Sequence, residues 1–291
     1  MIRTKHPIAS PSSIPTVVSS GAAGTTISGE EFKRFQTWIH QAAGITLAEH
    51  KHALVMGRLA SRLRHYQLTN YGDYFRLLTG GSHPGEARIA VDLLSTHETH
   101  FFREPKHFDF LGRQVLASPK GGRPLRVWSA AGSTGEEAYS IAMILTATLA
   151  DSPWEVLASD VSERVLERAR SGHYAIERAA SIPDAHLRAC CLKGIGAQQG
   201  TFVIEPKVRA RVQFMHINLN HALPHIGLFD AIFMRNVMIY FNQETKRNVV
   251  ARILAHLRPG GHLFIGHSES LNGVCSALKS VASSVYQSPV T

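Results

Sequence analysis

The sequence lacks a long apolar run and is poor in cysteine. No stretch approaches the roughly 20 apolar residues that cross a bilayer, and the first residues contain no apolar signal-peptide core. The 3 cysteines, Cys190, Cys191 and Cys275, do not form the even, spaced set of a disulfide framework. These absences exclude a small disulfide-rich scaffold and predict free thiols in a reducing compartment. We therefore expect a cytoplasmic protein with no membrane insertion.

The sequence also has fewer acidic than basic residues. The chain has 22 Asp and Glu against 31 Lys and Arg, which gives a formal net charge of +9. This charge favours an acidic partner: nucleic acid, anionic lipid or a glutamate-rich protein surface. The 291 residues, 44% of them hydrophobic, are enough for one large domain or two modest ones with a real core.

The N-terminal third predicts a disordered tail followed by a small helical domain. Residues 1–26 mix Ser, Thr, Pro, Gly and Ala with little to bury. Ser28 and Glu31 then match a capping box ahead of apolar residues at helical spacing, so a helix begins there. Further helical patterns fill the segment 27–95, at about Glu49–Leu63, Tyr71–Leu77 and Pro84–Leu94.

The second of these helices is strongly basic. It carries Lys51, Arg58, Arg62 and Arg64, with no acidic residue between Lys51 and Arg64. Such a run is either a solvated helix face or a docking surface for an acidic partner. Taken alone, the pattern favours the solvated face.

The segment 96–118 links the helical domain to the rest of the chain. Its first part is too polar for a core and too aromatic for a plain linker, and Lys106–Ala117 has a helical pattern. His97, Glu98 and His100 suggest zinc, but the helical motif of metalloproteases has its two histidines four apart, and these are three apart. We therefore expect no metal.

Residues 126–139 are the centre of the remaining segment, 119–291. Apolar residues pass into the small residues 130–135 and then into a helical pattern, which predicts a strand, a tight turn and a helix. A doubly wound α/β domain opens its ligand crevice in this way. Glu136 and Glu137 occupy the helix start, where they would repel a pyrophosphate. A positively charged nucleoside without phosphate fits better, and S-adenosylmethionine is such a ligand.

Polar residues follow several predicted strands, on the side where such sheets bind ligands. Asp160 ends the strand 156–160, near the position, roughly 20 residues past the glycine turn, where dinucleotide folds bind ribose hydroxyls with an acid. The alternative for Asp160 is an N-cap of the helix Ser162–Arg170. The other candidates are Asn218 and Leu219 after the strand Phe214–Ile217, and Arg235, Asn236 and Tyr240 after the strand Phe229–Met234.

The α/β alternation is interrupted at about residues 171–213. A helical piece, three glycines and the alternating runs 201–205 and 211–215 predict a short antiparallel β insertion with an exposed edge. The insertion is either a decoration or a module that docks a partner's peptide by strand addition. After it, a helix at about 243–257, a strand at 262–266 and a last strand at 283–287 complete the domain.

Seven short runs occur in an order that points to a known family. They are Phe101–Glu104, Arg126–Ala131, Ser133–Glu137, Ala158–Asp160, Phe229–Phe233, Arg235–Phe241 and Gly266–Glu269. Together they resemble the chemotaxis receptor methyltransferases, the CheR family, over about residues 27–287. The resemblance implies an α/β, class I and Rossmann-like S-adenosylmethionine-dependent methyltransferase domain with a small antiparallel β insertion, preceded by a small all-α domain.

The resemblance also implies an activity and a set of site residues. The activity is O-methylation of glutamates on the cytoplasmic helices of methyl-accepting chemotaxis receptors, with S-adenosylmethionine as donor and S-adenosylhomocysteine as product. Cofactor contacts would fall on His97, Thr99, Arg103, Glu136, Asp160, Asn218, Leu219, Arg235 and Asn236, with Arg103 and Tyr240 near the reacting groups. His97 stands where the family has asparagine, although imidazole can also donate or accept.

In this context the basic helix becomes the preferred docking face for acidic receptor helices. The loop Gly194–Gly200 of the insertion becomes a candidate for binding a receptor's C-terminal peptide. An acceptor glutamate, whose side chain has an ordinary pKa of about 4.3, is ionised near neutrality, so the reaction needs no general base.

Two other functions fit part of the sequence. A nucleic-acid methyltransferase would explain the positive charge, but Met234–Val237 lacks the Asn/Asp-Pro-Pro-Tyr/Phe of amino-methylating enzymes, and neither Cys190 nor Cys275 follows a proline. A non-catalytic module that senses the cofactor and docks receptors would not need Arg103 and Tyr240. Because both are present, the sequence favours the enzyme.

Overall fold

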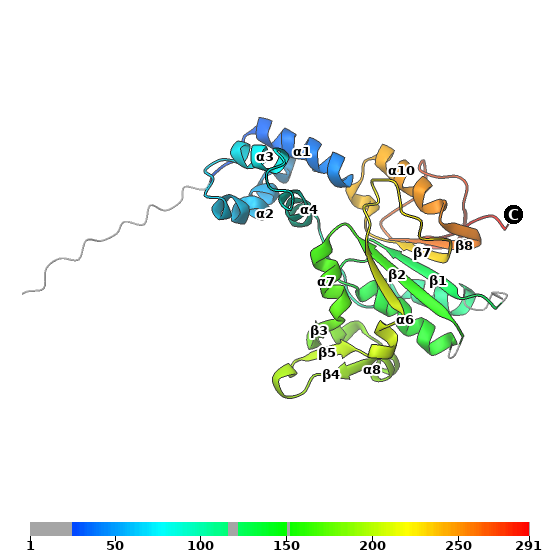
Figure 1. Ribbon diagram of the computed structural model, residues 1–291. Coiled ribbons are helices and arrows are strands. Elements are labelled where there is room, and N and C mark those ends of the chain that lie inside the picture. Colours follow the sequence, from blue (N-terminus) through cyan, green and yellow to red (C-terminus); the bar gives the residue numbers. More distant parts are fainter. Residues whose placement is uncertain (1–24, 116–121, 150–151, 291) are drawn as a thin grey trace, which may run out of the picture.

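The computed structural model describes residues 25–115, 122–149 and 152–290 (Figure 1). Most of the tail expected at 1–26 lies outside these residues, as does the end of the helix expected at Lys106–Ala117. Figure 1 shows a helical group, a central sheet flanked by helices, and a small sheet at the end away from the helical group. Within the described residues, no helix combines the length and the apolar character needed to cross a membrane.

In the described part of the chain, four α-helices form the N-terminal group. Ser28 and Glu31 make the predicted capping box, and Gly44 ends the first helix in the left-handed conformation, with φ of 73°. Asn70 caps the third helix by accepting a hydrogen bond from the backbone of Asp73. The helices are α1 (Gly29–Ala43), α2 (His52–His65), α3 (Tyr71–Thr79) and α4 (Glu86–Leu94), with the 3-10 turn η1 (Glu49–Lys51) before α2.

Aromatic side chains fill the core of this group. Phe32, Phe35 and Tyr74 are almost wholly buried. The Phe35 ring also makes edge contacts with Tyr71 and Phe75, with centroids 6.5 and 5.2 Å apart. Burial of these rings drives the packing, because helices this short are marginal alone in water.

Two arginines of α2 have internal partners, which corrects the expectation of a continuous basic docking face. Arg62 donates two hydrogen bonds to the Glu86 carboxylate, at 2.8 and 2.6 Å. Arg58 donates to backbone carbonyls at the end of α4, at 2.7 and 2.8 Å. Lys51 and Arg64 are the exposed members of the basic set.

In the described residues the central sheet has seven strands, in the order β6-β2-β1-β7-β8-β10-β9. The strands from β6 to β8 pair in parallel, and β10 and β9 add antiparallel pairs at one edge. Strand order reverses at β1, as in the predicted doubly wound class. The strands are β1 (Leu125–Ala130), β2 (Trp154–Asp160), β6 (Val212–His216), β7 (Phe229–Met234), β8 (Leu257–Ile265), β9 (Lys279–Ala282) and β10 (Val285–Gln287).

Helices cover both faces of this sheet. Val127 and Phe233 face the cluster that contains α6, while their neighbours Trp128 and Ile232 face the cluster that contains α10. Strands buried on both faces are apolar throughout, and β7 is an example. The flanking helices are α5 (Pro105–Phe110), the π-helix η2 (Leu111–Val115), α6 (Glu136–Leu149), α7 (Glu163–Ser171) and α10 (Gln243–Leu254).

The interruption of the α/β alternation is a small antiparallel sheet, as predicted, but it ends earlier than expected. The run 211–215 belongs to β6 of the central sheet, where it pairs in parallel with β2. An alternating β pattern does not identify its partner strand, so the sequence could not assign this run. The small sheet, in the order β3-β5-β4, consists of β3 (His173–Ala175), β5 (Thr201–Ile204) and β4 (Cys191–Lys193).

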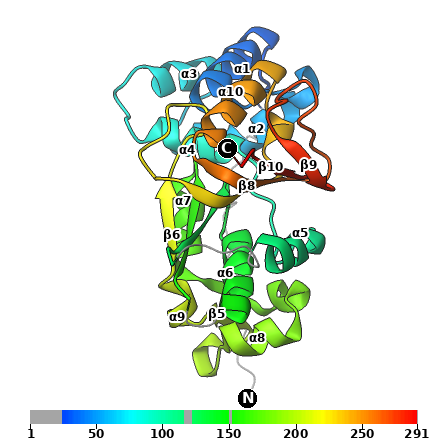
Figure 2. The ribbon, with the colours of Figure 1, turned by 90° about the vertical axis from the view of Figure 1, so that its right-hand side faces the viewer.

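The small sheet is anchored to α6. Tyr174 and Phe202 are buried in the same cluster as Tyr139, and the Tyr174 hydroxyl donates to the carbonyl of Thr134 at 2.7 Å. Figure 2 shows this module, with α8 (Asp184–Cys190) and α9 (Pro206–Arg209), at the opposite end of the molecule from α1–α4.

The last strands also differ from their predicted boundaries. α10 ends at Leu254 and β8 begins at Leu257, so Pro259 lies inside the strand rather than before it. The pairing with β7 shifts register at this point, which is where a strand tolerates proline. The sequence pattern does not predict β9.

Glu86 connects three helices of the N-terminal group. Its carboxylate accepts hydrogen bonds from Arg62, from Tyr66 at 3.0 Å and from Tyr74 at 2.6 Å. Burial alone would raise the pKa of Glu86, but these hydrogen bonds outweigh it and keep the pKa below its ordinary value. The side chain is therefore ionised in the folded protein near neutrality.

Replacing Glu86 by Gln should lower the free energy of unfolding by about 2 kcal/mol, because the partly buried Arg62 and the hydroxyls of Tyr66 and Tyr74 lose a charged acceptor. Glu30→Gln is the control, since Glu30 pairs with Arg34 in an exposed position and should cost less than about 1 kcal/mol. Urea denaturation measures both. Because the pKa of Glu86 is lowered on folding, its advantage should be complete near neutrality and be lost as pH falls below about 4.3. Equal effects of the two variants would contradict this role.

Candidate active site

A cavity lies at the carboxyl ends of β1 and β7, beside the reversal of strand order. The end of α1, the segment between α4 and α5, and the segments that follow β1, β2, β6 and β7 enclose it. All predicted site residues except Glu136 line it. The lining residues are Ala43, Ile45, Ser95–Thr99, Arg103, Ala131–Ser133, Glu137, Asp160, Val161, Ile217–Leu219, Arg235–Val237, Tyr240 and Phe241.

The turn after β1 presents backbone to the cavity because it uses left-handed residues. Ala131, Ser133 and Gly135 have φ of 66°, 51° and 94°. This conformation costs a non-glycine residue roughly 1–2 kcal/mol, so other contacts must maintain it. One such contact is the hydrogen bond from the Ser133 backbone N–H to Asp160 Oδ2, at 3.0 Å.

Asp160 is buried at the end of β2. Its Oδ2 accepts from Ser133, and its Oδ1 accepts from the Ser162 backbone N–H at 3.0 Å. Burial raises the pKa of this carboxyl. The carboxylate keeps acceptor capacity beyond its backbone contacts, which suits hydroxyl donors such as those of a ribose. The N-cap of α7 is Ser162, so the structure does not support the alternative assigned to Asp160.

Glu136 and Glu137 point to different surroundings, and this corrects the choice made from the sequence. Glu136 is turned away from the cavity and accepts hydrogen bonds from Thr134 at 2.6 Å and Arg178 at 2.9 Å. Glu137 lines the cavity, where Oε1 accepts from Ser129 at 2.7 Å. Burial raises the pKa of both carboxyls. The candidate acidic residue for the ligand is therefore Glu137.

Arg235 lies against the cavity with a side chain only 1% exposed. Its guanidinium is 2.9 Å from Glu104 Oε2 and 3.0 Å from Glu137 Oε2, and it also donates to the carbonyl of Arg103. Planar donors directed at several oxygens make a buried guanidinium tolerable. Burial and the charge of Arg235 lower the pKa of the nearby His107 to about 4, so this ring is neutral near pH 7.

The segment between α4 and α5 carries two more strained residues. Phe102 and Glu104 have φ of 52° and 59°, so the chain turns sharply on both sides of Arg103. His97 lines the same cavity, and its Nε2 lies 3.3 Å from Asp92 Oδ1 on α4. The contact of His97 with a cofactor stays a prediction.

The N-terminal helices close one side of the cavity. Asn218 donates to the carbonyl of Ala42, at 2.6 Å, and Ile45 forms an isolated antiparallel bridge with Phe241. Sequence reasoning missed the lining residues Ala43 and Ile45, because apolar side chains carry no chemical signal. It missed Glu137 because two adjacent acids at a helix start are equivalent until the helix is oriented.

Glu269 holds the segment that follows β7. Its Oε2 accepts from the backbone N–H groups of Asn236 at 2.9 Å and Gly266 at 2.7 Å, and its Oε1 accepts from Ile239 at 3.3 Å. Asn236 is left-handed, with φ of 56°. A Cβ at Gly266 would lie 2.6 Å from Asn236 Nδ2 and 2.9 Å from Glu269 Oε2, so a larger residue would displace these two side chains. Glu269 therefore fixes the cavity residues between Arg235 and Tyr240.

The lining agrees with S-adenosylmethionine as ligand. Asp160 has lone pairs for ribose hydroxyls, and Glu137 offers a carboxylate for a positively charged group. No lysine is among the lining residues, all of which belong to the described ranges, so the cavity has no phosphate-binding lysine. The strand order and this lining define a class I methyltransferase-type domain.

Comparison with known families identifies the chain further. Residues 97–287 match the model of the "CheR methyltransferase, SAM binding domain", and residues 30–95 match the "CheR methyltransferase, all-alpha domain". The chain belongs to the CheR methyltransferase family. It is an S-adenosylmethionine-dependent methyltransferase.

Curated relatives match over most of the chain. The chemotaxis protein methyltransferase of Escherichia coli is 43% identical over 84% of this chain and 86% of its own length. Chemotaxis protein methyltransferase 2 of Pseudomonas aeruginosa is 41% identical over 88% of this chain and 92% of its own length.

Replacing Glu269 by Ala should lower the free energy of unfolding by about 2 kcal/mol, because three backbone N–H groups lose their acceptor. It should also weaken S-adenosylmethionine binding by roughly tenfold, because the segment that carries Arg235 and Asn236 is released. Titration calorimetry measures the cofactor affinity, and thermal unfolding measures the stability. Ser268→Ala, at an exposed neighbour, is the control. Unchanged cofactor affinity in Glu269→Ala would remove the positioning role.

Proposed function

We propose that this chain transfers the methyl group of S-adenosylmethionine to glutamate side chains of chemoreceptor cytoplasmic domains and so forms glutamate methyl esters. The observation that carries the proposal is a CheR family match on a chain whose cavity holds Arg103 and Tyr240 beside the cofactor candidates. The relatives' name, chemotaxis protein methyltransferase, supports a chemotaxis protein as acceptor. The protein would act in the cytoplasm, where those receptor domains lie. Neither nucleic-acid methylation nor a non-catalytic sensing role gains support from the family match.

A glutamate acceptor needs little chemical activation. The ordinary pKa of a glutamate side chain, about 4.3, makes the acceptor an anion near neutrality, so no general base is required. S-adenosylmethionine, when bound, supplies an electrophilic methyl group. The carboxylate oxygen forms the new C–O bond, and the C–S bond breaks with its electron pair left on sulfur.

The chain's own contribution is alignment and exclusion of water. Holding the reacting groups in the right orientation can lower the activation free energy by up to roughly 7–11 kcal/mol. Arg103 would orient the acceptor carboxylate without neutralising it, since tight ground-state binding would slow the transfer. Tyr240 would hydrogen-bond the acceptor oxygen or shape the path of the methyl group.

We infer that Asp160 accepts the ribose hydroxyls of the cofactor and that Glu137 faces its positively charged end. The buried position of Asp160 and the cavity-facing position of Glu137 support these roles. The other proposed cofactor contacts are His97, Thr99, Arg103, Asn218, Leu219, Arg235 and Asn236, all of which line the cavity.

Two surfaces are proposed to dock the receptor. On α2, the exposed Lys51 and Arg64 replace Arg58 and Arg62 as the candidates for acidic receptor helices. On the small sheet, β4 lies at an edge, and the nearby Leu192 and Ile195 are 50% and 83% exposed. An edge strand with exposed apolar neighbours suits a receptor's C-terminal peptide, bound by strand addition.

Glu137→Gln should weaken S-adenosylmethionine binding by roughly tenfold or more, because a charge-assisted contact in the cavity is lost. The loss should be smaller for S-adenosylhomocysteine, which lacks the sulfonium charge. Glu136→Gln is the matched control, because Glu136 pairs with Arg178 outside the cavity. The affinity of this variant for the cofactor should stay within about threefold of the wild-type value. Calorimetric titration of both variants with S-adenosylmethionine and S-adenosylhomocysteine measures these affinities. The assignment fails if Glu136→Gln has the larger effect on affinity.

The proposed reaction is tested by methyl transfer from radiolabelled S-adenosylmethionine to a panel of acceptors. The panel holds receptor cytoplasmic fragments with and without their C-terminal peptide, RNA and DNA. We expect label on receptor, released by alkali as methanol, because carboxyl methyl esters are base-labile. The Asp160→Asn variant, which should lose cofactor affinity, controls for a contaminating methyltransferase.

Each other outcome has a definite meaning. Base-stable label on nucleic acid would overturn the acceptor and leave the fold unaffected. No label, despite measurable cofactor binding, would favour the sensing module. Equal labelling of receptor with and without its C-terminal peptide would remove the docking role of the small sheet.

A further inference from the structure

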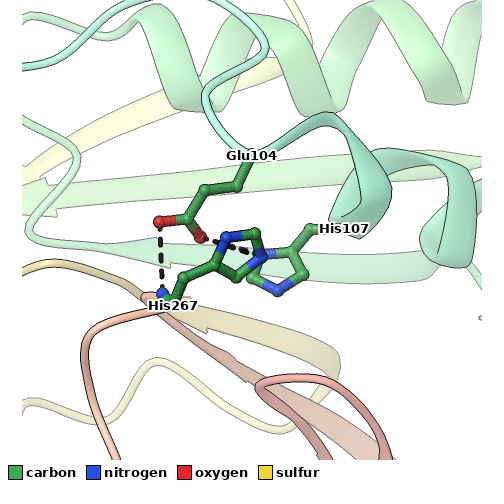
Figure 3. A group of neighbouring side chains, drawn as sticks. All are labelled: Glu104, His107 and His267. Atoms are coloured by element: carbon green, nitrogen blue, oxygen red, sulfur yellow. Dashed lines mark hydrogen bonds and ion pairs between the residues drawn. The ribbon is translucent and has the colours of Figure 1, made fainter.

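Three potential metal ligands from distant parts of the sequence lie together beside the cavity. Glu104 is the residue before α5, His107 is in the first turn of α5, and His267 follows β8. Figure 3 shows the three side chains directed toward one another. Within the described residues this is the group of His, Cys, Asp and Glu side chains compact enough to hold an ion, and His97, Glu98 and His100 form no such group.

The spacing of the group approaches that of a zinc site. His107 Nδ1 is 3.4 Å from Glu104 Oε2, and His267 Nε2 is 3.8 Å from the same oxygen. All three ligand atoms lie within 4.8 Å of one another. Ligand atoms around a tetrahedral Zn²⁺ are about 3.4 Å apart, so small side-chain rotations would complete the geometry.

The hydrogen bonding of His107 leaves a lone pair in the middle of the group. Its Nε2 lies 3.4 Å from the carbonyl oxygen of Ser283, which can only accept, and in the tautomer that donates there Nδ1 carries the lone pair. Nδ1 then faces Glu104 Oε2, which is a second acceptor. Both atoms are buried; Nδ1 has no hydrogen-bond partner, and Oε2 forms an ion pair with Arg235. An imidazole whose other nitrogen donates to a backbone carbonyl is the usual arrangement of a metal-bound histidine.

The charges and accessibility of the group also admit an ion. The guanidinium of Arg235 is 2.9 Å from Glu104 Oε2, which opposes a cation, but Arg235 is shared with Glu137 and a backbone carbonyl. Two imidazoles and one carboxylate suit Zn²⁺ and its neighbours better than Mg²⁺ or Ca²⁺. The His267 side chain is 44% exposed, which gives an entry path from solvent.

We propose that Glu104, His107 and His267 form a three-ligand binding site for Zn²⁺ or a similar divalent transition-metal ion, with water in the fourth position. Metal binding at this site does not depend on which molecule accepts the methyl group.

The test is a titration of the tag-free full chain with Zn²⁺, in competition with a chromophoric chelator. We expect one equivalent to bind, and His267→Ala to weaken that binding at least roughly tenfold. This variant should fold, because the exposed side chain is removed while the His267 backbone N–H still donates to Glu104. His225→Ala, at another exposed histidine, should bind like the wild type.

Equal affinities of wild type and His267→Ala, or no stoichiometric binding at all, would overturn the site and leave Glu104 as an ion-pair partner of Arg235 only. Substitution with Co²⁺ gives a second measurement. Visible d–d bands without thiolate charge transfer support nitrogen and oxygen ligands. A thiolate band would place the ion on a cysteine and would also overturn the proposal.

Discussion

The buried guanidinium of Arg235 is the interaction on which the candidate site depends. It pairs with Glu137 at the start of α6 and with Glu104 and the carbonyl of Arg103 before α5, so these two segments meet the segment after β7 around one charge. A charge removed from water is stable only when its donors and its counter-charges are in place. The segment between α4 and α5 is therefore part of the site, and its two left-handed residues are the conformational cost of bringing it there.

The all-α part is also integral to the cavity. Asp92 on α4 is bound by Ser162 and Arg164 of the α7 region and lies against His97. Hydrogen bonds outweigh the effect of burial and lower the pKa of Asp92, so its carboxylate is ionised and pairs with Arg164. This junction and the contacts of α1 with the segments after β6 and β7 hold the helical part against the cavity. Both the helical and the α/β parts therefore enclose the cavity.

Much of the architecture could be predicted because its causes are local. The capping box of α1, the strand–turn–helix at 125–149 and the apolar strand β7 each follow from spacing and residue type. The same reasoning failed where the partner is distant. It could not assign 211–215 to the central sheet, since that depends on pairing with β2. It also could not find that Arg58 and Arg62 have internal partners, since Glu86 and the end of α4 approach α2 only in the folded chain.

The sequence alone determined the class of sheet, the turn that opens the crevice and most residues at the strand ends. These follow from periodicity, from glycine and small residues in the turn, and from the rule that parallel strands end on one side. Tertiary structure alone decided that Glu137 rather than Glu136 faces the cavity. It also decided that Ala43 and Ile45 enclose the cavity, and that Glu104, His107 and His267 meet. The reason is physical: local pattern fixes what an element is, whereas its rotation and neighbours are set by packing and charge between residues far apart in the chain.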